Sequence, residues 1–248
     1  MNILLSGLGG HMGAEVVKVA GSGNYDAKIV SGVDPNGAPY EDIPCARDFD
    51  SANPAVDLVM DFSHHTSTAA LLSFCVKNRL PLVLATTGHT EEEKAQIFEA
   101  SKEIPLFFAA NYSLGVALTI EFAKKAAAVF PDAEIEIIEK HHDRKADAPS
   151  GTALAIAEAL KEVRPELTIH NGRSGFGKRT REEIGIHAIR MQNIVGEHEV
   201  IIGTGTQTLT LKHEAHDRAL FAEGALAAAE FLMGKPAGLY DMKSMVSM

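Results

Sequence analysis

Hydrophobic and polar positions in the first half of the chain follow two alternating periods. Short, continuously apolar runs typical of buried strands alternate with stretches in which apolar residues recur every three or four positions, as in helices. The predicted strands occupy 2–7, 28–34, 56–63, 81–88 and 105–113, and the predicted helices occupy 11–22, 66–79 and 90–103. This alternation predicts an α/β fold with a Rossmann-type, doubly wound parallel sheet covered by helices.

The pattern changes after residue 113. A long helix is predicted over 114–130, and in the strand at 133–140 Ile135 and Ile137 alternate with glutamates, so one strand face should be wet. A helix at 152–163 precedes three glycine-punctuated strands and a closing helix, at 184–190, 198–205, 207–215 and 218–234. We therefore expect a smaller α+β domain with a mixed or antiparallel sheet.

The closing helix is expected to return to the first domain. This gives a dinucleotide-binding domain of residues 1–112 and 219–248, and a second domain of residues 113–218. Hinges are expected near 111–114 and near Arg218, where the chain passes between the two.

Composition narrows the class of protein. The chain has 248 residues, a formal net charge of −10 and no long basic run, which argues against a nucleic-acid surface. Cys45 and Cys75 form no CxxC pair, so neither a disulfide framework nor a zinc site is expected. The N-terminus lacks the features of a signal peptide, and no apolar run approaches the ~20 residues that span a membrane. We expect a cytoplasmic protein without membrane contact.

The sequence GLGGHMG follows the first strand and leads into a helix. Gly7, Gly10 and Gly13 have the spacing that lets backbone amides and a helix N-terminus face a pyrophosphate. Asp34 closes the second strand, where an acidic side chain can hydrogen-bond the adenine ribose. The alternative is a tight strand–helix turn without a ligand. Agreement of strand, turn, helix and acid favours dinucleotide binding.

Asp34 is followed by Pro35, Asn36 and Gly37, with no arginine to hold a 2′-phosphate. By charge this favours NADH over NADPH, unless a cation from elsewhere or a backbone amide compensates. The segments 61–66 and 85–88 end parallel strands and should border the same cleft. His64 and His65 are interpreted as cofactor-edge or surface histidines, and no metal site is predicted, because no acidic or cysteine partner is suitably spaced.

A second cluster, HHDRKADAPSGTA, extends from His141 to Ala153. Ser150, Gly151 and Thr152 precede an apolar helical run, so their amides lie at a helix N-terminus that can bind a carboxylate or phosphate. Lys145 adds positive charge, and a histidine here could move a proton at neutral pH. His141 and His142 follow a strand, so their side chains should diverge. A polar loop with a helix cap explains the same residues.

Family resemblance decides between these interpretations. The motifs GLGGHMG, DFS, ATTG, AANYSLGV, HHDRKADAPSGTA and EIGIHAIR…IVGEH together resemble bacterial 4-hydroxy-tetrahydrodipicolinate reductase (dihydrodipicolinate reductase), over nearly the whole chain and in the same order. The resemblance implies a homotetramer assembled through the second domain, which also binds substrate. It implies NADH- or NADPH-dependent reduction of a small heterocyclic dicarboxylate in lysine and diaminopimelate biosynthesis.

The resemblance also implies residue roles. His141 would be the proton donor or acceptor and Lys145 the proton donor. Four residues would hold the substrate carboxylates: His142, Lys145, Gly151 and Thr152. The cofactor would contact the glycine loop, Asp34 and two later strand ends: Gly7, Leu8, Gly9, Gly10, His11, Met12, Gly13, Asp34, Ala85, Thr86, Thr87, Ala109, Ala110, Asn111 and Tyr112.

The chain departs from the family pattern in two places. Met191 and Gln192 stand where the family commonly has paired glycines, and the region 24–50 is short. Two other classes share some features. An aspartate or homoserine dehydrogenase has the glycine loop but lacks the His-His-x-x-Lys run before Pro-Ser-Gly-Thr. A redox-sensing module would bind the dinucleotide without turnover and would need no proton donor.

Overall fold

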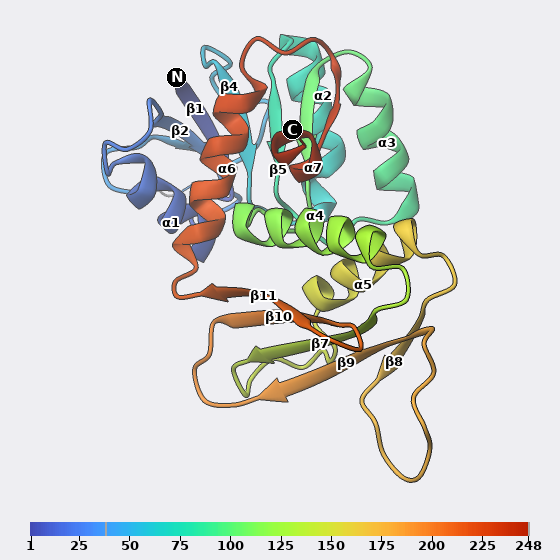
Figure 1. Ribbon diagram of the computed structural model, residues 1–248. Coiled ribbons are helices and arrows are strands. Elements are labelled where there is room, and N and C mark those ends of the chain that lie inside the picture. The colour runs from blue at the N-terminus through green and yellow to red at the C-terminus, as the bar shows by residue number, and fades with distance from the viewer. Residues whose placement is uncertain (38, 248) are drawn as a thin grey trace. The chain divides into compact units, whose positions relative to one another are not determined.

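The chain forms two compact units in a computed structural model that describes residues 1–37 and 39–247 (Figure 1). One unit comprises Met1–Tyr112 and Ala219–Met245, and the other is built from Ser113–Arg218, with the described residues 246–247 also assigned to it. The first unit is therefore made of two segments that are distant in sequence, with the second unit inserted between them.

The first unit is built on a seven-stranded sheet in which all neighbouring strands are parallel. Its order is β12-β6-β5-β4-β1-β2-β3. The bounds are β1 Asn2–Ser6, β2 Lys28–Val33, β3 Cys45–Ala46, β4 Leu58–Asp61, β5 Leu82–Leu84, β6 Pro105–Phe108 and β12 Gly238–Tyr240. The predicted parallel sheet is confirmed. Strands β3 and β12 were not predicted, because runs of 2 and 3 residues carry no readable period.

Helices cover both faces of this sheet (Figure 1). They are α1 His11–Ala20, α2 Thr68–Asn78, α3 Glu91–Ser101 and α6 Ala219–Leu232, with a 3₁₀ turn at His65–Ser67 and a short C-terminal helix α7 Met242–Val246. Helix α6 packs on α1 and over β4, β5 and β6, and it contributes seven buried residues. A Cβ atom on its Gly224 would lie 1.7 Å from the Tyr112 carbonyl oxygen, so only glycine permits this contact.

The second unit holds a five-stranded mixed sheet in the order β11-β10-β7-β9-β8. The bounds are β7 Glu134–His141, β8 Thr168–Asn171, β9 Glu183–Arg190, β10 Gly196–Gly203 and β11 Thr208–Ala215, with helices α4 Leu114–Val129 and α5 Gly151–Val163. β7 runs parallel to β9 and antiparallel to β10. The predicted mixed sheet is confirmed, and β8 is an additional edge strand.

Helices α4 and α5 pack against each other beside one face of this sheet. Ile135 and Ile137 of β7 are completely buried in that core, while Glu134 is exposed and Glu136 half-buried. The alternation seen in the sequence therefore corresponds to a buried face and a wetter face, as predicted.

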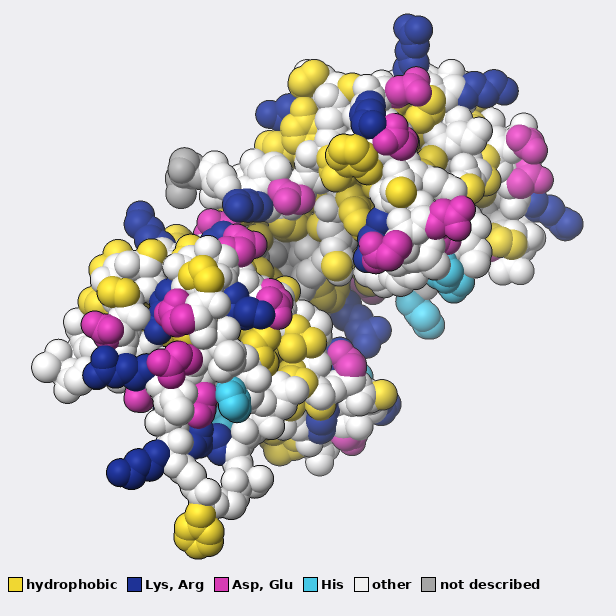
Figure 2. Space-filling model, turned by 90° about the vertical axis from the view of Figure 1, so that its right-hand side faces the viewer, with side chains coloured by type: hydrophobic (Ala, Val, Ile, Leu, Met, Phe, Trp, Pro, Cys, Tyr) yellow, Lys and Arg dark blue, Asp and Glu magenta, His cyan; other side chains and the backbone are white. Residues whose placement is uncertain are grey.

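Surface charges are mixed in sign. Lysine and arginine alternate with aspartate and glutamate over the face shown in Figure 2, without a continuous basic region. Among the described residues, no helix combines the length and the apolar character needed to cross a membrane.

Candidate active site

The glycine loop between β1 and α1 has the geometry of an anion-binding turn. Gly7 adopts φ +82°, which favours glycine, and its N–H donates to the Val33 carbonyl at 2.8 Å. A Cβ on Gly13 would lie 2.3 Å from the Gly7 carbonyl oxygen, so helix and loop can approach this closely only with glycine. The N-cap of α1 is Gly10, whose residue type offers no capping side chain, and the first turn has no acidic residue. Its amides are therefore available to an anion.

Asp34 lies directly beside this loop. Its Oδ2 accepts a hydrogen bond from the Gly9 amide at 3.2 Å, and its Oδ1 accepts one from the Asn36 amide at 3.0 Å. The carboxylate is thus fixed at the end of β2, where the sequence predicted a ribose contact.

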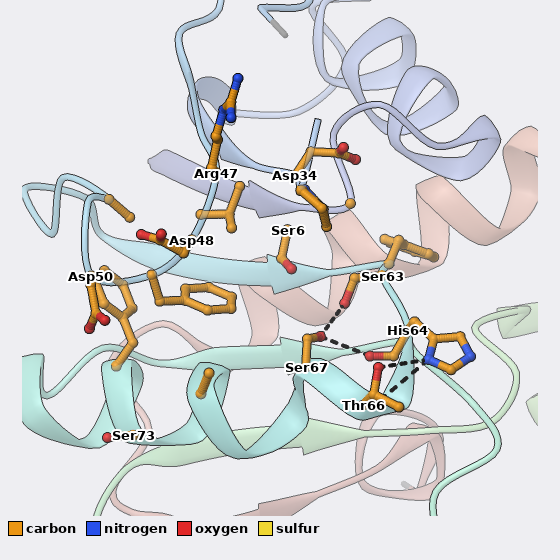
Figure 3. A pocket seen from close by; sticks show the side chains of 18 of the residues that line it. Ser6, Asp34, Arg47, Asp48, Asp50, Ser63, His64, Thr66, Ser67 and Ser73 are labelled. Carbon is orange, nitrogen blue, oxygen red and sulfur yellow. Dashed lines mark hydrogen bonds between the residues drawn. The ribbon is translucent and has the colours of Figure 1, made fainter. Parts of the chain in front are cut away.

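A pocket of about 850 Å³ opens at this edge of the sheet. Gly7, Gly10 and Asp34 line it together with Ser6, Ser63, His64 and Arg47. Figure 3 shows Asp34 and Arg47 on one side of the pocket, with Ser63, His64, Thr66 and Ser67 on the other. The volume lies in the range of small-molecule and cofactor sites.

Arg47 was not predicted as a site residue. It follows the short strand β3, which pairs with β2 and so brings residue 47 to the side of the pocket occupied by Asp34. Gly37 has φ +62°, and a Cβ there would lie 2.5 Å from Arg47 Cγ, so the arginine stem crosses Gly37. The only signal in the sequence was an unassigned arginine shortly after Asp34, because a two-residue strand leaves no pattern.

Other predicted cofactor residues are not part of this pocket lining. The Thr86 hydroxyl donates to Asp61, a hydrogen bond of 2.5 Å, and the Tyr112 hydroxyl donates to the Leu84 carbonyl at 2.9 Å. Leu8 is fully buried. The side chains of these three residues stabilise the ends of the strands, which leaves their backbone as the part that can face a ligand.

Both histidines after β4 have a hydrogen-bonding side chain beside Nδ1. His65 Nδ1 lies 3.0 Å from Glu93 Oε1, and His64 Nδ1 lies 3.0 Å from the Thr66 hydroxyl. In the described part of the chain, no group of three or more His, Cys, Asp or Glu side chains is placed to hold a metal ion.

In the second unit, two polar side chains continue the buried face of β7. Ile135 and Ile137 are followed at the same parity by Glu139, which is 0% exposed, and His141, which is 9% exposed. In the pairing of the strands, Glu139 lies opposite His198 of β10, and His141 lies opposite Arg190 of β9. A carboxylate, an arginine and two histidines therefore meet at one end of this core.

Glu139 is held by four hydrogen bonds. Its Oε2 lies 2.6 Å from His141 Nδ1 and accepts from Arg190 Nη1 at 2.9 Å. Its Oε1 accepts from Arg190 Nη2 at 2.7 Å and from the Ser150 amide at 3.0 Å. Burial favours the neutral acid, but the hydrogen bonds from Arg190, His141 and Ser150 outweigh it and lower the pKa of Glu139. The side chain is therefore a buried carboxylate.

His141 is buried at the end of β7, whereas His142, the first residue after the strand, is half-buried. Burial lowers the pKa of His141, and the Glu139 hydrogen bond opposes that shift. At neutral pH the ring is mainly uncharged and can accept a proton.

Lys145 and the start of α5 lie close to this histidine in sequence. Lys145 Nζ is 2.9 Å from Asp147 Oδ1, and the Lys145 side chain is about one-quarter exposed, at 24%. The Ser150 hydroxyl caps α5 by accepting from the Ala153 amide at 3.2 Å, and it also lies 3.1 Å from His198 Nε2. Gly151 is exposed, and a Cβ there would meet no atom within 4 Å, so the first turn of α5 has open space beside it.

The loop that carries Lys145 is fixed to the turn after β9. The Arg190 guanidinium donates to the Asp147 carbonyl at 2.6 Å, and the Asp143 amide donates to the Gln192 carbonyl at 3.2 Å. Gln192 adopts φ +54°, a conformation that glycine adopts more easily. Met191 and Gln192 therefore form the turn in this chain with a left-handed glutamine.

His198 should make the protein sensitive to acid. Burial lowers the pKa of His198 to about 4 from 6.5. Between these values the unfolded histidine binds a proton that the folded one does not, so the free energy of unfolding should fall as the pH decreases from 6.5 to 4. The loss should reach about 3 kcal/mol.

Urea unfolding from pH 7.5 to pH 4 measures this effect. In a His198→Asn variant, the free energy of unfolding should depend less on pH. Some dependence should remain, because the pKa values of His89, His141 and His213 are also lowered. If the free energy of unfolding fell equally with decreasing pH in the variant and in the unmodified chain, His198 would not be the cause of the acid sensitivity.

The Rossmann-type sheet, the glycine loop and the second unit's histidine–lysine cluster define an oxidoreductase with a dinucleotide-binding fold. Models of dihydrodipicolinate reductase match both parts of the chain, the N-terminal model over residues 1–112 and the C-terminal model over residues 115–246. The chain belongs to the dihydrodipicolinate reductase family.

Individual relatives agree with this membership. The 4-hydroxy-tetrahydrodipicolinate reductase of Clostridium tetani is 44% identical over 252 residues, which cover 100% of this chain and 97% of that protein. The enzyme of the same name from Caldanaerobacter subterraneus subsp. tengcongensis is 43% identical and covers 99% and 98%. The dipicolinate-bound dihydrodipicolinate reductase from Paenisporosarcina sp. TG-14 superimposes with a TM-score of 0.84 at 26% identity, over 99% of each chain.

Proposed function

We propose that this chain reduces 4-hydroxy-tetrahydrodipicolinate to tetrahydrodipicolinate with NADH or NADPH, as a step of lysine and diaminopimelate biosynthesis. One observation carries the proposal. The chain belongs to the reductase family, and β7, the Lys145 loop and the start of α5 provide an orientated histidine, an ammonium group and a helix N-terminus. The first unit, residues 1–112 and 219–248, would bind the dinucleotide, and residues 113–218 would bind the substrate.

The first unit fits a dinucleotide. The turn at Gly7 and Gly13 leaves backbone close to the pocket, the N-terminus of α1 can face a pyrophosphate, and Asp34 can accept hydrogen bonds from ribose hydroxyls. The rest of the loop and the start of α1 would also contact the cofactor, at Gly9, Gly10, His11 and Met12. Residues 85–87 and 109–112 would contact the cofactor from the adjacent strand ends.

The 4-hydroxyl group must leave as water, together with a hydrogen of the adjacent ring carbon. The nicotinamide, when bound, would then supply a hydride to C4 of the unsaturated ring. The ring becomes electron-rich, and a proton must follow. Lys145 carries a full positive charge that can stabilise this electron density and a proton that it can donate. His141, with Nδ1 directed at Glu139, exchanges a proton through Nε2.

The substrate's two carboxylates need donors at fixed positions. The amides of Gly151 and Thr152 at the start of α5 supply one group of donors, together with the helix dipole. Lys145 and His142 add side-chain donors. The relative from Paenisporosarcina sp. TG-14 was solved with dipicolinate bound, and that small aromatic dicarboxylate has the chemistry this arrangement would recognise.

Two alternatives are less well supported. An aspartate or homoserine dehydrogenase would share the first unit, but the family models match both units of this chain to dihydrodipicolinate reductase. A redox-sensing module that binds the dinucleotide without turnover would have no need for a histidine held through a buried carboxylate.

An assay coupled to the preceding synthase tests the proposed reaction. The synthase condenses pyruvate with aspartate semialdehyde, and oxidation of NADH or NADPH is then followed separately. Cofactor oxidation that depends on the synthase product supports the proposal. No oxidation with either cofactor would refute it.

NADH should be used at least as well as NADPH, because the Asp34 carboxylate repels a 2′-phosphate. Arg47 is the cation placed to compensate on the same side of the pocket. Replacing it by alanine should lower kcat/KM for NADPH by about 10- to 100-fold, the value of one charge-assisted hydrogen bond, and change NADH little.

Lys77 provides a matched control, since it is a second cation of the same pocket and comes from α2. Lys77→Ala should leave the ratio of NADPH to NADH use unchanged. A strong NADPH preference in the unmodified chain would contradict the expected cofactor use. An unchanged ratio in Arg47→Ala would contradict the role of Arg47.

Assembly into a homotetramer remains part of the proposal. The second unit offers exposed apolar side chains on β9, on the turn that follows it and on β11, at Ile189, Met191 and Leu209, which are 40%, 52% and 40% exposed. Contact between copies would bury these side chains.

A further inference from the structure

We infer that Glu139 is a positioning residue of the second unit's site: it fixes which nitrogen of His141 exchanges the proton, and it holds the start of α5 beside that histidine. The inference rests on the proposed function, which gives His141 its role. It concerns a side chain that would touch neither substrate nor cofactor.

Glu139 uses both carboxylate oxygens, and each accepts two hydrogen bonds. Oε2 joins His141 Nδ1 to Arg190, at 2.6 and 2.9 Å, while Oε1 joins Arg190 to the Ser150 amide, at 2.7 and 3.0 Å. The side chain is 0% exposed, so no solvent competes for these contacts. It connects β9, β7 and the N-cap of α5.

An ionised carboxylate can only accept hydrogen bonds. The proton of neutral His141 must therefore be on Nδ1, and Nε2 carries the lone pair. His141 Nε2 faces Gly196 of β10. A Cβ atom at that position would lie 3.1 Å from Nε2, so a larger residue there would crowd this nitrogen. Because Glu139 binds Nδ1 and Gly196 has no side chain to crowd Nε2, Nε2 is the nitrogen that can exchange a proton.

The same carboxylate fixes the helix start. The Ser150 amide donates to Glu139, and the Ser150 hydroxyl caps Ala153 and contacts His198. The next two residues, Gly151 and Thr152, are the proposed carboxylate donors. Movement of Glu139 would therefore shift both the His141 ring and the amides that are proposed to bind the substrate carboxylate.

Several charged or titratable groups surround His141. Glu139 lies on its own strand, Arg190 on β9, Lys145 on the loop before α5 and His198 on β10, with its ring centroid 5.1 Å away. Farther from the ring, Asp147 forms an ion pair with Lys145, and the charge of His213 on β11 lowers the pKa of His198. Of these groups, Glu139 alone accepts a hydrogen bond from His141 Nδ1, so its removal should have a distinct signature.

The test is Glu139→Gln, read by ¹⁵N NMR of the histidine rings and by the pH profile of kcat. The unmodified chain should show His141 protonated on Nδ1 at pH 8, with the resonance assigned by its absence in His141→Gln. In Glu139→Gln the amide NH₂ can donate to Nδ1, so the proton should move to Nε2. The kcat should fall by about 10²- to 10⁴-fold, as when an amide replaces an orientating carboxylate in a triad. The His141 ionisation should move to lower pH, because the carboxylate raises it.

Glu136→Gln is a matched control on the same strand. Glu136 also contacts an arginine and a histidine, with Arg179 Nε at 2.9 Å and His187 Nε2 at 2.8 Å, but its side chain has the opposite parity. This change can alter stability, yet it should leave the His141 tautomer and the kcat profile unchanged. If Glu139→Gln leaves Arg190 too poorly compensated to fold, Glu139→Gln/Arg190→Gln removes both charges and should give the same tautomer change.

The inference is overturned if His141 of the unmodified chain is protonated on Nε2, a result that needs no variant. It is also overturned if Glu139→Gln keeps the Nδ1 tautomer and an unshifted profile. An unmodified chain that shows the Nδ1 tautomer but reduces no synthase product would refute the proposed function instead, so the two failures are distinguishable.

Discussion

Replacing Lys145 by alanine should lower kcat for the proposed reduction by about 10²- to 10⁴-fold, the usual contribution of a positioned proton donor. The Lys145 ammonium group is held 2.9 Å from Asp147 Oδ1, and the backbone carbonyl of Asp147 accepts a hydrogen bond from Arg190, so the proposed donor sits on a fixed loop. His141→Gln should cause a loss of the same order, because glutamine cannot exchange a proton near neutral pH. Steady-state kinetics with the synthase-coupled assay measure both.

Arg144 supplies the control for this experiment. It is the residue before Lys145, is exposed, and hydrogen-bonds to Asp143 and Asn193. Arg144→Ala should change kcat by less than about threefold, since an exposed ion pair contributes little. If Lys145→Ala and His141→Gln both retained the rate of the unmodified chain, the reductase hypothesis would be wrong.

The second large effect is expected at the glycine loop. A Gly13→Ala variant would place a Cβ 2.3 Å from the Gly7 carbonyl oxygen and 2.6 Å from that of Leu8, so the loop must move away from α1. Overpacking of this kind costs about 1–3 kcal/mol. We expect NADH to bind about 10- to 100-fold more weakly, as measured by fluorescence titration.

Gly21 at the other end of α1 tests whether this effect is local. It has φ −73°, and its added Cβ would meet the Val17 carbonyl at 3.3 Å, a contact that a small adjustment relieves. Gly21→Ala should leave the dissociation constant for NADH nearly unchanged. Unaltered NADH binding in Gly13→Ala would show that the loop does not form the cofactor site.

The sequence was sufficient to predict the five longer strands of the parallel sheet, because most of their residues are buried and the helices between them keep a clear period. The positions of Asp34 and the glycine loop were predictable because glycine spacing, strand, helix and acidic residue all agreed. Arg47 was not, since its position depends on the pairing of a two-residue strand with β2.

The second unit shows a different limit. Glu139 could have been recognised, because it has the same parity as Ile135 and Ile137 on a strand whose inward face was already assigned. Its partners could not, because Arg190 and His198 reach it only through the strand order β10-β7-β9. In a mixed sheet, strand order is not determined by the order along the chain, so buried ion pairs between strands require the structure.

The inserted arrangement of the two units has a consequence for synthesis on the ribosome. Helix α6 supplies seven buried residues of the first unit, and β12 adds its edge strand, yet both follow residue 218. Residues 1–112 therefore emerge with an open apolar face, whereas Ser113–Arg218 is continuous and can fold as soon as it leaves the exit tunnel. The segment translated first is the one completed last, and until α6 arrives we expect its exposed core to be accessible to chaperones and proteases.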